Sequence, residues 1–492
     1  MSLPPTDIAE GGASARTILF AALMTIAFGA VWLTAGSVYL PHVDDFYIIA
    51  WAKAVADGDT MPVHALSRFY PQPEYFHIAP RLHIYALAAW IDGFGWGLDS
   101  LLAFRATMFV LTSGIVAAAA LHLRRPLVAV LFPVALLVTM LHSGQRPDST
   151  ALLLVIFALA VLWTDGANGH SHGVVLRTLA KTAAVLAPLA WPSALAYGAA
   201  ILIVSDLRDL RRKPLAQLVL EDAIALAAGI VVLGLMVGFD YLHFVRAYLR
   251  FTAEHDDILS LNSMRLGTGM AFLAAAALVR RRAPDAAFLA SAVGVGALIG
   301  LALHTKFAIS TPLNVLAVLA IVDGATRSSR GRLVAWSGAA AAFAVMLANQ
   351  IIFAVAARPS PEAAAAVRAF AEQARREGRV LLADEIGATY GLGLDITGVY
   401  SWSFSEHHPK SRPPSIETIR EGESWIISAY TVHGWLKSSG VAGFPARRAD
   451  VDRFLPGTPC LSGRNSCRLP AVRWAYYLVE RRNGAVSVKS VP

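Results

Sequence analysis

Two adjacent carboxylates, Asp44 and Asp45, lie between the first long apolar stretch of the chain and an aromatic-rich segment. A charged group at a membrane surface is costly, and neighbouring like charges raise the cost of ionising each other. One carboxylate could act as a general base on an acceptor hydroxyl, or the pair could bind a divalent cation such as magnesium or manganese. Helix capping is the structural alternative, but a cap needs only one of the two. The pair therefore favours proton or cation chemistry at a membrane face.

Two other segments carry basic groups that could bind a phosphate. In Y-F-H-I-A-P-R-L-H, His77 and Arg81 could bind the phosphate or shape a pocket for a donor substrate, although a lone histidine is more often structural. In H-S-G-Q-R-P-D, Arg146 could hold a phosphate through two hydrogen bonds and Asp148 could orient it. The structural alternatives are an interfacial position for Arg146 and a helix cap for Asp148. Neither segment has the tight ligand spacing of a zinc site.

The short segment H-T-K-F supplies one more cation, Lys306. Lys306 could neutralise a lipid-linked phosphate, and its structural alternative is an anchor at the membrane interface. Other acidic and histidine pairs have no partner that the sequence identifies, and we interpret them as solvated surface: Asp256-Asp257, Asp384-Glu385 and His407-His408.

The composition is that of a membrane protein with several spans. Of the 492 residues, 56% are hydrophobic and 15% are charged, whereas soluble domains average about 25% charged residues. The net charge of +8 comes with basic loops between apolar stretches and does not indicate nucleic-acid binding. Residues 1–12 contain no Lys or Arg, and no small-residue cleavage site follows the first apolar stretch, so we expect a retained first helix.

Apolar stretches predict about eleven membrane spans, several of them shorter than the ~20 residues that a perpendicular helix needs. They lie at 17–39, 102–121, 127–141, 149–164, 174–189, 194–205, 222–239, 266–279, 285–303, 308–322 and 333–356. The region 174–205 could instead be one span. With two spans there, the most basic loops share one side of the membrane, and short basic loops stay in the cytoplasm. This predicts an inner N-terminus and an outer position for Asp44, Asp45 and the C-terminal region.

Two outer loops, 40–101 and 240–265, are long, whereas the inner loops are short. The first loop contains an amphipathic stretch whose apolar residues could lie in the membrane interface: Phe46, Ile49, Trp51 and Val55. A second apolar stretch, Leu82 to Trp90, is too short to cross and is expected to lie along the surface or to re-enter. Protein mass is thus concentrated on the outer face.

The composition changes near residue 358 to that of a small soluble domain. Residues 362–377 predict an amphipathic helix, and 379–385, 425–430 and 474–482 predict strands. We therefore expect a transmembrane domain over 1–357 and a compact outer α/β domain over 358–492. Cys460 and Cys467 could form a disulfide in an oxidising compartment.

Together, the candidate residues place carboxylates and cations on one outer face. Sugar transfer from a lipid phosphate needs this combination, because the leaving phosphate gathers negative charge and the acceptor hydroxyl needs a base. Its transition state resembles an oxocarbenium ion. A single displacement then inverts the anomeric centre without a covalent enzyme intermediate.

These motifs resemble the GT-C superfamily of membrane glycosyltransferases, and its bacterial branch in particular, which is similar to the protein O-mannosyltransferases and the lipid A aminoarabinose transferase. The resemblance rests on the acidic pair after one N-terminal helix, R-P-D after the third span and K-F before a proline. The two short spans at 174–205 and D-E-I-G-A-T-Y-G-L-G-L-D extend it, whereas H-I-A-P-R-L is a loose match to a His-Pro-Pro-Leu-like element. It implies Asp44 or Asp45 as base, Arg146 and Lys306 as phosphate contacts, and dependence on a divalent metal in some members only.

The expected fold is an all-α polytopic membrane protein, N-terminus in and C-terminus out, with a small C-terminal α/β domain. The expected function is an inverting glycosyltransferase that moves a hexosyl or pentosyl group from a polyprenyl-phosphate donor to a lipid, glycan or protein acceptor. The expected location is the outer, periplasmic face of a bacterial inner membrane, among membrane lipids and without nucleic acid. The alternatives are a lipid-linked saccharide flippase or transporter and a non-catalytic envelope-assembly subunit. A flippase or transporter would need ionisable groups deep in its spans, whereas the few charges within the apolar stretches, such as Lys181 and Arg105, are expected near helix ends.

Overall fold

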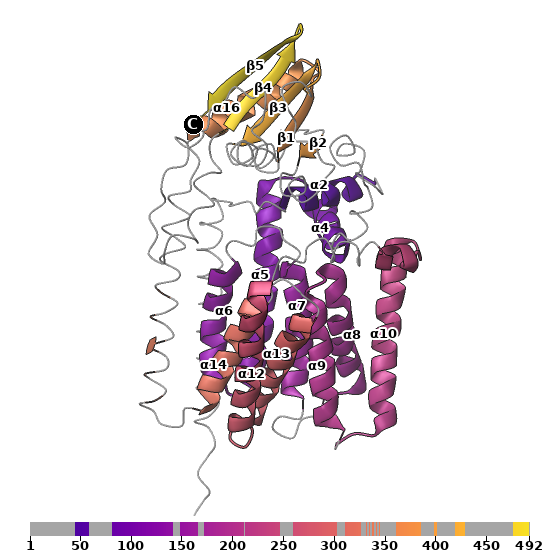
Figure 1. The fold of residues 1–492 in the computed structure, drawn as a ribbon, viewed down its shortest axis with the longest axis vertical. Coiled ribbons are helices and arrows are strands. Elements are labelled where there is room, and N and C mark those ends of the chain that lie inside the picture. The colour runs from indigo at the N-terminus through magenta and orange to yellow at the C-terminus, as the bar shows by residue number, and fades with distance from the viewer. Residues whose placement is uncertain are drawn as a thin grey trace, which may run out of the picture.

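The structure is a computed structural model that describes 45–58, 81–140, 148–165, 172–210, 212–246, 259–302, 310–325, 361–384, 398–400, 419–428, 476–491 and single positions between 331 and 344. Within these ranges the chain is mostly helical, with one mixed sheet near its C-terminus (Figure 1). The first and last expected spans, 17–39 and 333–356, fall outside the described ranges apart from single positions in the second.

The described apolar helices stand side by side as a bundle (Figure 1). They are α5 (Leu98–His122), α6 (Pro126–Met140), α7 (Asp148–Thr164), α8 (Val174–Ala190), α9 (Ala194–Asp209), α10 (Leu215–Val237), α12 (Leu259–Val279), α13 (Pro284–Ala302) and α14 (Ser310–Ala325). Three stretches among them, Ser100–His122, Leu215–Val237 and Pro284–Ala302, are long and apolar enough to cross a membrane. The region 174–205 forms two helices, α8 and α9, which pack against each other after a break at Trp191.

Small residues let the helices of the bundle approach closely. Gly198 of α9 faces the backbone carbonyl of Ala184 in α8, where a methyl group would collide. A methyl group on Gly269 of α12 would lie 3.1 Å from the carbonyl oxygen of Gly294 in α13. Close backbone approach through small residues is typical of helix pairs in membranes, where burial from water does not drive association.

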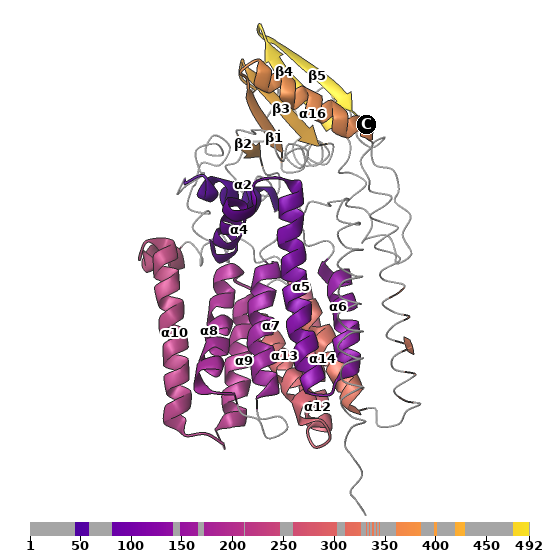
Figure 2. The ribbon, with the colours of Figure 1, turned by 180° about the vertical axis from the view of Figure 1, so that it is seen from behind.

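A layer of two helices, α2 (Asp45–Ala56) and α4 (Arg81–Phe94), lies between the bundle and the sheet (Figures 1 and 2). Ile49 and Trp51 of α2 are buried in a cluster that includes Ile84 and Leu87 of α4. The expectation that Ile49 and Trp51 lie in the membrane interface is therefore wrong. The apolar face of α2 packs against α4, and this burial stabilises the layer because both apolar faces are removed from water.

The sheet has the strand order β2-β1-β3-β4-β5. Its strands are β1 (Val380–Asp384), β2 (Gly398–Tyr400), β3 (Glu423–Ser428), β4 (Tyr476–Arg482) and β5 (Ala485–Val491). β2, β1 and β3 are parallel, and β4 and β5 are antiparallel to their neighbours. The helix α16 (Pro361–Arg376) packs on the sheet, as its amphipathic sequence predicts.

Apolar residues of α16 and the sheet belong to the same buried cluster as those of α2 and α4. β2 also contacts α2 directly. We call the end of the bundle that faces α2, α4 and the sheet the sheet end. The links between α5 and α6, α9 and α10, and α12 and α13, which carry many of the basic residues, lie at the opposite end, called the far end (Figure 1).

Candidate functional site at the sheet end of the bundle

The structure describes the side chains of two of the predicted site residues, Arg81 and Asp148. Asp45 is the first residue of α2. The remaining predicted positions lie outside the described residues: Asp44, His77, Arg146, Lys306, Cys460 and Cys467. The roles assigned to these residues from the sequence stay predictions.

Arg81 begins α4 and reaches the end of α10. Its guanidinium donates a hydrogen bond to the backbone carbonyl of Met236, in the last turn of α10. A cation is favoured there because the carbonyl end of a helix carries partial negative charge. Burial lowers the pKa of Arg81, but a guanidinium stays protonated at neutral pH. Arg81 therefore places a fixed positive charge where α4 meets α10.

Asp148 begins α7 and is buried, with 1% of its surface exposed. Two residues further on, the Oγ1 of Thr150 lies 2.8 Å from Nδ1 of His83 in α4. The ring of His83 is fully buried and packs edge-on against Phe104 of α5. His83 thus joins α4 to α7, and this contact brings the helix starts at Arg81 and Asp148 to the same end of the bundle.

A second polar group at the sheet end was not predicted from the sequence. Arg265 of α12 is buried and donates a hydrogen bond of 2.8 Å to the carbonyl of Gly300, near the end of α13. Arg265 also interacts electrostatically with Tyr197 of α9, whose hydroxyl is hydrogen-bonded to Ser310 at the start of α14. The only sequence signal was one arginine at the edge of an apolar span.

Arg265 contacts Gly300, and Tyr197, with which Arg265 interacts, contacts Ser310. Gly300 and Ser310 precede and follow the residues 303–309, which contain Lys306 and lie outside the described part of the chain. Within the described part of the chain, the sheet end therefore presents the half-buried guanidinium of Arg81 and the buried guanidinium of Arg265, each at a separate helix junction. Cations of this kind suit an anionic leaving group such as phosphate.

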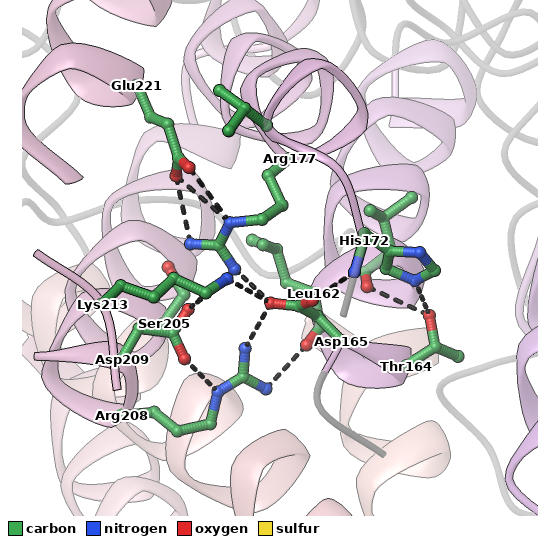
Figure 3. A network of polar contacts seen from close by, with 12 residues as sticks. Leu162, Thr164, Asp165, His172, Arg177, Ser205, Arg208, Asp209, Lys213 and Glu221 are labelled. Atoms are coloured by element: carbon green, nitrogen blue, oxygen red, sulfur yellow. Dashed lines mark hydrogen bonds and ion pairs between the residues drawn. The ribbon is translucent and has the colours of Figure 1, made fainter. Parts of the chain in front are cut away.

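The far end contains a larger buried network of charges (Figure 3). Arg177 of α8 is fully buried and pairs with Asp165 after α7, with Asp209 of α9 at 2.7 Å and with Glu221 of α10 at 3.1 Å. Lys213 contacts Asp165 at 3.0 Å. The network ties together the far ends of four helices.

Arg208 extends the network to a fifth helix. It donates hydrogen bonds to Asp209 and to the carbonyl of Leu162 at the end of α7, and its guanidinium lies 4.5 Å from the ring centre of Phe288 in α13.

Lys181 lies deeper in the bundle than the sequence indicated. We expected it near a helix end, but it is the eighth of the 17 residues of α8 and is fully buried. Its Nζ lies 2.7 Å from a carboxylate oxygen of Asp206 and 2.7 Å from one of Asp222. Glu221 approaches to 3.5 Å. An ionisable group is therefore present inside α8, and carboxylates lie beside it.

Among the described residues, no group of three or more His, Cys, Asp and Glu side chains could hold a metal ion. Asp44 and the side chain of Asp45 are outside that set. The magnesium or manganese site expected at this pair stays a prediction.

Two solved structures are similar to the chain. ArnT from Cupriavidus metallidurans bound to undecaprenyl phosphate matches 87% of this chain and 95% of its own, at 15% identity and a TM-score of 0.48. Arabinosyltransferase EmbB from Mycobacterium smegmatis matches 67% of this chain, at 16% identity and a TM-score of 0.40. The match covers 32% of EmbB, so this chain spans about a third of that protein.

Both similar proteins belong to the GT-C superfamily, the superfamily that the sequence motifs resemble. Both identities are below 25% and both TM-scores are below 0.5. No family model and no curated protein matches the chain.

Proposed function

We propose that the chain is a membrane glycosyltransferase that moves a sugar from a polyprenyl-phosphate donor to an acceptor at the sheet end of its bundle. The contact between His83 and Thr150 is the observation that supports this most. Through this contact, the first residues of α4 and α7, Arg81 and Asp148, lie at the same end of the bundle. Arg81 and Asp148 come from two separate sequence motifs, and we selected each motif because its residues could bind or orient a phosphate.

In this proposal Asp44 or Asp45 removes the proton from the acceptor hydroxyl as the sugar is transferred. The base must lie close to that hydroxyl and be ionised at the working pH. Asp45 begins α2, a helix fixed by burial against α4, so the acidic pair borders a rigid element rather than a free loop. A rigid support keeps a catalytic group in the geometry that the reaction needs.

Fixed cations stabilise the departing polyprenyl phosphate. Arg146 and Lys306 are the cations selected from the sequence, and the structure adds Arg265, which is hydrogen-bonded to Gly300 near the end of α13. Arg265 is buried, so its attraction to a phosphate is screened less than that of an exposed arginine. An isoprenoid chain would approach such a site from the lipid, and the phosphate would stop at the helix ends.

We place the sheet end at the outer face of a bacterial inner membrane, because the links at the far end carry basic residues. The sheet and α16 lie on the same side as the proposed site and pack on α2 through β2. We propose that this C-terminal part, within 358–492, bounds the side from which the acceptor arrives.

Replacement of Asp44 and of Asp45 by Asn, one at a time, tests the proposed base. Sugar transfer is measured in membranes with undecaprenyl-phosphate-linked sugars, and Asp57→Asn is the matched control because Asp57 is exposed at the other end of α2. Loss of a general base lowers the rate about 10²- to 10⁴-fold, so one of the two variants should lose activity by this amount. Full activity in both, at normal expression, would remove the proposed base.

One feature of the structure fits the transporter alternative: the charges of Lys181, Asp206 and Asp222 are paired inside the bundle. The same assay separates the two functions by their products. A transferase releases free polyprenyl phosphate, whereas a flippase moves the lipid-linked sugar intact. Movement of intact donor across the membrane without released polyprenyl phosphate would favour the transporter.

A further inference from the structure

Two links between helices meet at one corner of the far end. Arg125, in the link between α5 and α6, donates two hydrogen bonds, of 2.8 and 2.6 Å, to the carboxylate of Asp285 in the first turn of α13. Asp285 follows Arg282 by three residues, which span at most about 10 Å. The link between α12 and α13 therefore lies beside the link between α5 and α6.

The end of α14 packs against both links. The carboxylate of Asp323 accepts a hydrogen bond of 3.2 Å from the backbone N–H of Leu127 in the first turn of α6. A methyl group on Gly324 would lie 2.7 Å from the Cβ of Ala283, which is buried in the link between α12 and α13. We call the segments 120–127, 279–286 and 320–325 the basic corner, and these contacts fix their positions.

The charges of the basic corner are unevenly placed. Its sequence contains five arginines and two carboxylates, Asp285 and Asp323. Both carboxylates contact groups of the fold, the guanidinium of Arg125 and the N–H of Leu127. Four arginines are exposed and form no ion pair with the residues that the structure describes: Arg124, Arg280, Arg281 and Arg282. The outer surface of the corner is therefore strongly positive.

Arg124 occupies a backbone position that favours glycine. Its φ is 57°, and the N–H of Arg125 donates a hydrogen bond of 2.7 Å to the carbonyl of Ala120 across the turn that ends α5. A residue in this left-handed conformation after a helix is usually glycine or asparagine, because a side chain crowds the backbone there. Arginine thus costs conformational free energy at this position. Attraction to the carbonyl end of α5 is the structural alternative for its side chain.

The exposed arginines lie just outside two of the helices that are long and apolar enough to cross a membrane. The stretch Ser100–His122 ends two residues before Arg124, and Pro284–Ala302 begins two residues after Arg282. Leu278, in the last turn of α12, is 81% exposed and in a membrane contacts lipid tails. A free phosphate would use the arginines alone, whereas a phospholipid matches both the cations and the apolar surface beside them.

We propose that the basic corner binds the head group of an anionic phospholipid, such as phosphatidylglycerol, in the membrane leaflet at the far end. A guanidinium can hold two phosphate oxygens at once, and basic pockets between membrane helices suit anionic head groups. Basic loops also set the orientation of a chain in the membrane, but orientation depends on the number of charges on one side and not on their meeting at one corner. The corner lies opposite the proposed site of sugar transfer and does not depend on it.

Native mass spectrometry of the full chain with phosphatidylglycerol tests the proposal. Arg124→Gln and Arg281→Gln should each weaken binding about 5-fold, since a basic residue near a membrane surface contributes about 1 kcal/mol. Arg212→Gln is the matched control, because Arg212 is exposed on the separate link between α9 and α10 and should bind like wild type. Phosphatidylcholine with the same acyl chains should bind more weakly to the wild type.

Three results of this experiment would overturn the proposal. Equal losses in Arg124→Gln, Arg281→Gln and Arg212→Gln would show only a general effect of surface charge. Equal binding of the two lipids would show that the negative head group is not recognised. Displacement of the lipid by an equal concentration of inorganic phosphate would assign the arginines to a free anion instead.

Thermal unfolding in detergent separates lipid binding from a structural role of Arg124. Without phospholipid, Arg124→Gly should unfold at or above the wild-type midpoint, because glycine adopts the left-handed conformation more readily. Added phosphatidylglycerol should raise the midpoint of wild type and Arg212→Gln more than that of Arg124→Gly, since a ligand stabilises the folded state according to its affinity. A lower midpoint of Arg124→Gly without lipid, or an equal rise in all three proteins, would contradict the proposal. Neither measurement uses sugar transfer.

Discussion

His83 and Thr150 are 67 positions apart in the sequence, yet the imidazole Nδ1 and the hydroxyl Oγ1 lie 2.8 Å from each other in a buried setting. This contact joins α4, which lies in the layer above the bundle, to the first turn of α7. The edge-on contact of His83 with Phe104 adds α5 to the same junction. The geometry of the proposed site depends on this junction.

Removal of either partner should therefore weaken both the fold and the site. His83→Ala and Thr150→Val should each lower the free energy of unfolding by about 1–3 kcal/mol, because each leaves a buried polar group without its partner. The double variant should cost less than the sum of the two, as expected for residues that interact. The measurement is thermal unfolding in detergent, with exposed His122→Ala as control. If the double variant lost as much free energy of unfolding as the two single variants together, His83 and Thr150 would not be energetically coupled.

Arg177 holds the buried charge network at the far end together. Arg177→Met should destabilise the chain by about 3–5 kcal/mol, since three buried carboxylates lose their common cation. Arg212→Met is the control, because Arg212 is exposed on the same link between α9 and α10. Thermal unfolding of both variants checks the prediction, and a loss for Arg177→Met as small as that for Arg212→Met would contradict it.

Gly198 allows α8 and α9 to touch through their backbones. Gly198→Ala should destabilise the chain by about 1–3 kcal/mol, because the added methyl group meets the carbonyl of Ala184, which cannot move aside like a side chain. Gly114→Ala on α5 is the matched control, since nothing lies within 4 Å of its added methyl group. Gly114→Ala should be neutral or slightly stabilising, because alanine favours helix more than glycine does. A tolerated Gly198→Ala would show that the two helices are further apart.

Glu377, between α16 and β1, should make the C-terminal unit sensitive to acid. A hydrogen bond from the Gln373 amide, and then contacts with Arg379 and Arg482, lower the pKa of Glu377 below 4.5. Because the folded pKa is depressed, its stabilising effect is present above the unfolded pKa and is lost as the pH falls through the folded pKa.

Hydrogen exchange in the full chain checks this acid sensitivity. The wild-type protection of β4, which ends at Arg482, a partner of Glu377, should fall between neutral and acid pH, after correction for intrinsic exchange. Glu377→Gln should show a smaller fall, and exposed Glu372→Gln on α16 should behave like wild type. An unchanged fall in Glu377→Gln would mean that Glu377 contributes nothing to the pH dependence.

Local patterns in the sequence predicted many of the described elements. The apolar run at Trp425 and the aromatic run at Tyr476 lie in β3 and β4, because buried strands need such residues on both faces. The break at Trp191 separated α8 from α9, since Pro192 disfavours the helical conformation of the residue before it.

Contacts between distant segments could not be predicted in this way. Ile49 and Trp51 have the pattern of a membrane-surface helix, and only the position of α4 shows that they are buried in the protein. Arg265 and Lys181 each appear in the sequence as isolated charges in apolar spans. Their partners, Gly300 and the pair Asp206 and Asp222, lie on other helices, so the helix packing alone reveals them.

The central claim is that helix ends at the sheet end of the bundle bind a polyprenyl phosphate. Native mass spectrometry of the purified chain with undecaprenyl phosphate tests it most directly, with Arg265→Gln as the site variant and Arg212→Gln, at the far end, as control. The wild type and Arg212→Gln should bind the lipid equally. Arg265→Gln should bind it about 10- to 150-fold more weakly, since one hydrogen bond to a charged group is worth about 1.5–3 kcal/mol. Absence of binding, or equal binding by all three proteins, would contradict the account.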